Sequence, residues 1–219
     1  QSEHDASLLN HYNDGGFMPL YHLAKSDFKN IPPLMIRELL ENPKNKFLAG
    51  HNNPLNTKSK KILTLSSLML IKYLGHLEKV LELEDIYVQE TVLNWIEATK
   101  ESLKHDKSTM SMSYKDGQYY KYESTQEEKD GLVQVYEDTY NLLLKLVLKK
   151  RIVKDYEYVI PVKIPVEVIL NIGHLDFYAI GFAINNNFQL ITEDNSSTKL
   201  YESFKYNTQY ISNMIPILQ

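Results

Sequence analysis

Short, mainly apolar runs alternate with segments of helical periodicity over much of the chain, and each pattern predicts its own kind of element. Residues 61–65, "KILTL", form a run that is typical of a buried strand. Residues 66–83 carry a helical pattern in which Ser66 or Ser67 is placed to cap the first turn. A second strand and a second helix follow at 85–104. This succession predicts βαβ units and a parallel sheet.

The middle of the chain interrupts this alternation. Residues 108–124 alternate in polarity on both sides of an Asp116-Gly117 pair, which is a short-range signature of a β-hairpin. Residues 125–150 then place apolar side chains at helical spacing over a long stretch. We therefore expect a hairpin and a helix to be inserted in the sheet domain at about 103–150.

The α/β pattern returns in the last third of the chain. A strand is predicted at 188–192, "FQLIT", and a helix after Asn195. At the other end, 16–42 reads as two short helices. We therefore expect a helical extension and linker over 1–60 and an α/β domain over 61–219.

Composition narrows the class of protein. The chain has 219 residues, of which 43% are hydrophobic, so it can bury a substantial core. Its net charge of −4 gives no general reason to bind polyanions, and the absence of cysteine favours a cytoplasmic location. The longest apolar run, 62–71, is too short to span a bilayer, so we expect no membrane association. Because the sequence starts without Met, we expect a piece of a longer protein whose other domains are partners.

Three acidic residues lie where an α/β fold can bring them together. Asp176 is near the start of a helical segment, and Glu193 and Asp194 end the strand pattern at 188–192. Acids in such places can hold a divalent cation. Simpler roles stay open, because Asp176 can complement helix-start N–H groups and the other two can be turn or cap residues.

Two segments have a common order of features. In 61–98, an apolar strand is followed by Ser, an apolar helix with a Gly turn, the strand "IYVQ" and another helix. In 171–219, the helix "HLDFYAIGFAINN" precedes a strand end of the type "LxTxD". Together they resemble the PIN domain family of metal-dependent ribonucleases. The resemblance implies a doubly wound parallel sheet flanked by helices, with four acids that bind Mg²⁺ or Mn²⁺ for phosphodiester hydrolysis.

The resemblance carries over only half of the family's acids. The acid expected to close strand one corresponds to Leu65, and the acid of the next helix corresponds to Trp95. The third acid matches Asp176, and the fourth matches Glu193, with Asp194 beside it. The last three are therefore the predicted catalytic and metal-binding residues, and the two losses predict a catalytically degenerate member.

The predicted hairpin interleaves aromatic and basic residues. Tyr119, Tyr120 and Lys121 are the candidates for nucleic-acid contact, because aromatic rings stack on bases and lysines pair with phosphates. Tyrosine is also typical of edge strands, and the same pattern can pack on a partner protein. Both interpretations stay open.

Three hypotheses follow. The first is a degenerate PIN-like domain that acts as an RNA- or protein-binding module of a larger protein. The alternative is an active Mg²⁺- or Mn²⁺-dependent endoribonuclease with a rearranged site that uses Asp176, Glu193, Asp194 and Glu90. The third sets the resemblance aside and predicts an interaction domain whose hairpin docks a protein. Since PIN-like domains often pair, the resemblance also implies a homodimer.

Overall fold

The structure, a computed structural model, describes the α/β part of the chain together with the hairpin and its helices. The expected N-terminal helices at 16–42 lie outside the described residues and stay a prediction. The described residues are 55–56, 58–83, 85–105, 110–115, 118–123, 125–154, 164, 168–169, 172–204, 211–212 and 214.

A five-stranded parallel sheet forms the centre of the fold. The strands are β1 (Lys61–Leu63), β2 (Ile86–Gln89), β5 (Ile152–Val153), β6 (Gln189–Ile191) and β7 (Ile211–Ser212). Their order in the sheet is β5-β2-β1-β6-β7. Strands β2 and β5 therefore lie on one side of β1, and β6 and β7, which come later in the chain, lie on the other side. The predicted α/β class with a parallel sheet is confirmed.

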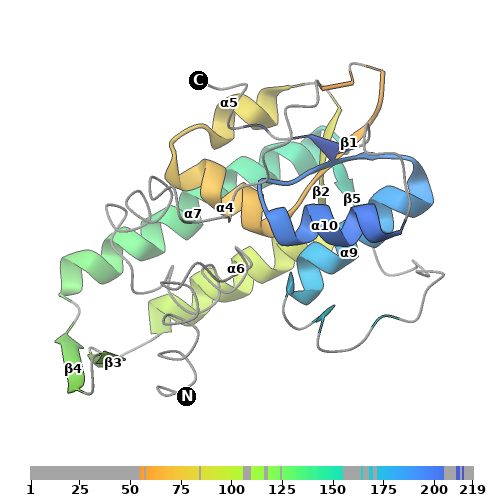
Figure 1. The fold of residues 1–219 in the computed structure, drawn as a ribbon. Coiled ribbons are helices and arrows are strands. Elements are labelled where there is room, and N and C mark those ends of the chain that lie inside the picture. The colour runs from red at the N-terminus through yellow and green to blue at the C-terminus, as the bar shows by residue number, and fades with distance from the viewer. Residues whose placement is uncertain are drawn as a thin grey trace.

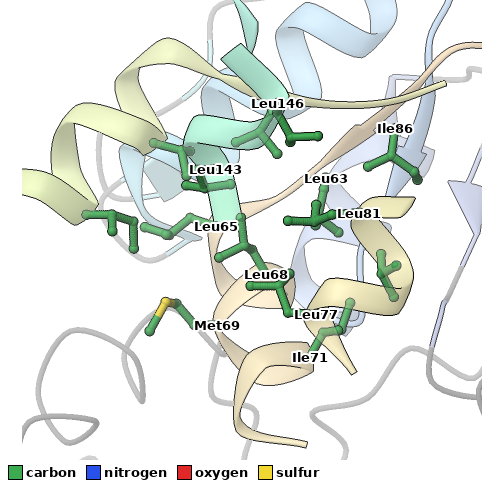
Figure 2. Packing of buried hydrophobic residues seen from close by; sticks show 14 of the residues in the cluster. Leu63, Leu65, Leu68, Met69, Ile71, Leu77, Leu81, Ile86, Leu143 and Leu146 are labelled. Carbon is green, nitrogen blue, oxygen red and sulfur yellow. The ribbon is translucent and has the colours of Figure 1, made fainter. Parts of the chain in front are cut away.

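Helices cover both faces of the sheet. Neighbouring residues of a strand point to opposite faces, and in β1 both sets of side chains are buried against helices. The helices are α4 (Leu65–Tyr73), α5 (Leu77–Glu82), α6 (Glu90–His105), α7 (Gln126–Leu148), α9 (His174–Asn186) and α10 (Asn195–Ser203). In β1, Leu63 packs in a cluster with side chains of α4 to α7, and Ile62 packs in another with side chains of α9. Figure 2 shows the first cluster, where Leu143 and Leu146 of α7 lie near Leu63.

The segment after β1 forms two helices, where the pattern predicts one. Gly75 has φ +77, a left-handed conformation that favours glycine, and it separates α4 from α5. Thr64 is the N-cap of α4, and its side-chain oxygen accepts the N–H of Ser67. The prediction that Ser66 or Ser67 caps the helix is therefore wrong, because the helix begins earlier than the apolar pattern indicates.

The predicted hairpin and long helix are confirmed, and they lie between β2 and β5. The hairpin consists of β3 (Met110–Lys115) and β4 (Gln118–Glu123), which pair antiparallel. It connects α6 to α7 and lies at the end of these helices that is remote from the sheet (Figure 1). The two helices pack together, with the Tyr140 hydroxyl donating to Glu97 at 2.9 Å and Lys104 paired with Glu137 at 3.1 Å.

Candidate functional site

The carboxyl ends of β1 and β6 are neighbours at the point where the strand order reverses. In open α/β sheets, this is the usual place for a ligand. Helices α4 and α10 begin directly after these strand ends, and the first turn of α9 contacts the start of α4. The side chains gathered here are polar, and all are at most 2% exposed. We call them the switch-point residues: Thr64, Ser66, Ser67, Asp176, Thr192, Glu193, Asp194 and Ser197.

Asp176 caps a helix other than its own. Its Oδ1 accepts the N–H of Ser66 at 3.2 Å, and the N–H of Leu65 and the Ser66 hydroxyl also donate to the carboxylate. These N–H groups belong to the first turn of α4, where they have no acceptor within the helix. Asp176 therefore complements a helix start, but that of α4, whereas the sequence placed it as the complement of its own helix, α9, whose start has no side-chain cap.

The other carboxylate oxygen of Asp176 has a different environment. Oδ2 is buried and makes no hydrogen bond with any residue that the structure describes. Burial raises the pKa of Asp176 from 3.8 to about 7, while the donors on Ser66 oppose the shift and the nearby Asp194 carboxylate adds to it. Close to neutral pH, the group therefore exists in both protonation states.

Glu193 connects three segments of the chain. Its backbone N–H donates to the Ser67 hydroxyl oxygen at 2.6 Å, and that oxygen also accepts the Thr64 hydroxyl at 2.8 Å. Its side-chain Oε1 accepts the N–H of Met214, near the end of the chain. Glu193 thus joins the ends of β1 and β6 to the segment that follows β7.

Asp194 is the N-cap of α10. Its Oδ2 accepts both the N–H and the hydroxyl of Ser197, each at 2.8 Å. Its backbone carbonyl accepts the hydroxyl of Thr198 at 3.1 Å. The interpretation of Asp194 as a cap residue is confirmed. In this role, its Oδ2 accepts both hydrogen bonds from Ser197.

The predicted metal-binding acids reach the same end of the sheet without forming a coordination set. Among the described residues, no three His, Cys, Asp or Glu side chains are grouped so that they could hold a metal ion. Asp176, Glu193 and Asp194 each direct an oxygen to protein donors. Mg²⁺ and Mn²⁺ need several oxygens converging on one point, and one oxygen of each of these acids already accepts a hydrogen bond from the protein.

The two positions matched to the missing acids belong to the hydrophobic core. Strand β1 ends at Leu63 and Thr64 caps the next helix, so Leu65 does not close strand one, which corrects the expectation from the sequence. Leu65 is 1% exposed and packs in the cluster of Figure 2. Trp95 packs against the same cluster, with its ring centroid 6.1 Å from that of Tyr136.

The predicted nucleic-acid contacts lie on β4, far from the switch-point residues (Figure 1). Tyr119 is 63% exposed, and Lys121 is exposed and paired with Glu123 of the same strand. Tyr120 lies opposite Ser113 of β3. The structure therefore does not bring the hairpin and the acids into one site.

Sequence reasoning missed the hydroxyl groups that surround the acids. Thr64, Ser66 and Ser67 are all buried, and each makes a hydrogen bond at the switch point. The available signal was the cluster of three hydroxyl residues at the end of a buried strand. It was interpreted only as a helix cap within the local chain.

Comparison of the chain with family models, with curated proteins and with solved structures found no match. Among the helices that the structure describes, none is long and apolar enough to cross a membrane.

Proposed function

We propose that the chain is a PIN-like α/β domain that acts as a binding module of a larger protein and has lost efficient metal-dependent catalysis. The observation that carries this proposal is the use of the acids. Asp176 caps α4, Asp194 caps α10, and Glu193 holds the backbone of Met214. Each of these carboxylates already accepts a hydrogen bond from a buried protein donor, so less of its acceptor capacity is left for a metal ion.

The general architecture supports the PIN-like part of the proposal. A doubly wound parallel sheet with acids after its central strands is what the resemblance implies. Thr64 and Leu65 follow the end of the first strand at Leu63, in the region where the family has an acid. Neither residue supplies a carboxylate.

A protein is the partner class that the hairpin end favours over RNA. A protein binds the phosphates of RNA through cationic side chains, which displace the counterions of the nucleic acid. Near the hairpin, however, Lys121 is paired with Glu123, and Lys104 is paired with Glu137. The first turn of α7 adds Glu127 and Glu128. Exposed aromatic side chains such as Tyr119 are typical of protein interfaces.

One observation favours the alternative, a metal-dependent ribonuclease. The Oδ2 atom of Asp176 has no donor among the described residues, and the Asp194 carboxylate raises the pKa of Asp176. A bound cation would relieve the mutual repulsion of two buried carboxylates. This alternative requires Glu193 and Asp194 to bring carboxylate oxygens to the same point as Oδ2 of Asp176.

A cleavage assay separates the two functions. Labelled single-stranded RNA is incubated with the wild-type chain and with Asp176→Asn, in Mn²⁺ and in EDTA. We expect intact RNA under every condition. Cleavage that requires Mn²⁺ and disappears in Asp176→Asn, but persists in the control Asp138→Asn, whose side chain is 48% exposed, would establish the ribonuclease and overturn the proposal.

A further inference from the structure

The hairpin is a two-stranded sheet with both outer edges open among the described residues. Among the strands that the structure describes, β3 and β4 pair only with each other, and the five-stranded sheet is separate from them. Two isolated strands are at best marginally stable in water, and a third strand or a packed element normally completes them. An open edge also exposes a row of backbone N–H and C=O groups that can pair with another strand.

The outer edge of β4 has charges that complement their own copy. Lys121 and Glu123 are two residues apart, on the same face of the strand, and form an ion pair with each other. In an antiparallel pair of β4 strands related by a twofold axis at Tyr122, Lys121 of one copy lies opposite Glu123 of the other. The twofold axis repeats the contact, so both lysines and both glutamates are paired.

We propose that a second copy of this chain adds its β4 to the β4 edge in this register, so that residues 121–123 of the two strands pair antiparallel and join the two hairpins. The inference rests on the proposed function as a binding module and names the partner of its hairpin. The position of the hairpin at the remote end of α6 and α7 leaves its edge away from the five-stranded sheet of either copy (Figure 1). The two β4 strands gain backbone hydrogen bonds, and the charge pairs set their register.

Sedimentation velocity of the full chain at increasing concentration tests the register with single charge reversals. The wild-type chain is expected to dimerise. Lys121→Glu places glutamates opposite each other, and Glu123→Lys places lysines opposite each other. Each variant alone should therefore raise the dimer dissociation constant about tenfold or more, because two favourable cross-strand pairs become repulsive. An equimolar mixture of the two variants should restore dimers, since every pair in the heterodimer is then of opposite charge.

A matched control and a folding check complete the experiment. Lys149→Glu makes the same change in net charge at an exposed position after α7 and should leave dimerisation unchanged. Circular dichroism is expected to show all variants folded, because both hairpin residues are exposed.

Three outcomes would overturn the proposed dimer. They are a wild-type chain that stays monomeric, variants that all dimerise like the wild type, and a mixture that fails to recover. Retention of single-stranded RNA by the monomer, weakened in Lys121→Glu, would assign the edge to RNA instead. Each of these results is independent of the RNA cleavage assay, so the dimer and the proposed function can fail separately.

Discussion

The switch-point residues and the hairpin are both polar in sequence, but the fold uses their polar groups in opposite ways. At the switch point, Asp176, Glu193 and Asp194 are at most 2% exposed, and their oxygens accept hydrogen bonds from the chain itself. On the hairpin, Tyr119 is 63% exposed and Lys121 forms an ion pair at the surface. The first group fixes the ends of β1 and β6 relative to α4, α9 and α10. The second lies at the surface of the hairpin.

The difference has an energetic consequence. A buried polar group that loses its partner costs about 1–3 kcal/mol, whereas an exposed ion pair contributes about 0–1 kcal/mol. Substitutions at the switch point should therefore act mainly on stability, and substitutions on the hairpin mainly on association. The predictions below test this division, beginning with the largest expected effect.

Introducing an acid at Leu65 should strongly destabilise the fold without creating a metal site. Leu65 is 1% exposed and lies in the first core cluster (Figure 2), so Leu65→Asp buries a carboxylate among apolar side chains. We expect a loss of about 4 kcal/mol or more in the free energy of unfolding, measured by urea denaturation. The volume-conserving control Leu65→Met should lose less than about 1.5 kcal/mol.

The opposite outcome would revise the placement of Leu65. If Leu65→Asp folded with near wild-type stability and were stabilised further by Mn²⁺, its side chain would have to reach the end of the sheet. The division between a structural switch point and a functional hairpin would then fail.

The buried carboxyl of Asp176 should make stability fall as pH rises. Its pKa is raised from 3.8 to about 7 in the folded state, so its contribution is complete below about pH 4 and is lost as the pH rises through 7. At about 1.4 kcal/mol for each pKa unit, the loss amounts to about 4 kcal/mol at most. The quantity to measure is the unfolding free energy of wild type minus that of Asp176→Asn, from pH 4 to pH 8. The difference should decrease over this range.

A second variant sharpens the assignment to Asp176. The Ser66 side chain donates to the carboxylate and lowers its pKa, so Ser66→Ala should move the transition to higher pH. A transition that stays in place in Ser66→Ala, or that survives in Asp176→Asn, would belong to another group.

The elements with strong local patterns could be predicted from the sequence, and the contacts between distant segments could not. The strands at 61–63, 86–89 and 189–191 follow from apolar runs, and the pairing of 110–115 with 118–123 follows from the alternating pattern there, while the predicted Asp116-Gly117 turn lies outside the described residues. The resemblance includes a Gly turn in this region, but the helical pattern alone predicts one helix over 66–83, because helical periodicity continues on both sides of Gly75.

The candidate site shows the same limit more clearly. Sequence order indicated that Asp176, Glu193 and Asp194 reach one end of the sheet, because parallel strands end at a common edge. Which donor each oxygen meets depends on side chains from far along the chain, such as Ser66 for Asp176. Pattern reasoning has no access to that choice, so it could not separate a helix cap from a metal ligand.

The smallest effect is expected for a large side chain on the hairpin. Tyr119→Ser should change the unfolding free energy by no more than about 0.5 kcal/mol, because the ring is 63% exposed. Tyr136 is the matched control, since its ring is 1% exposed and lies near Trp95 in the core between α6 and α7. Tyr136→Ser should cost about 3–5 kcal/mol. Urea denaturation of both variants at a concentration where the chain is monomeric makes the comparison. A loss at Tyr119 comparable to that at Tyr136 would mean that the hairpin supports the fold, and that its exposed ring is not reserved for a partner.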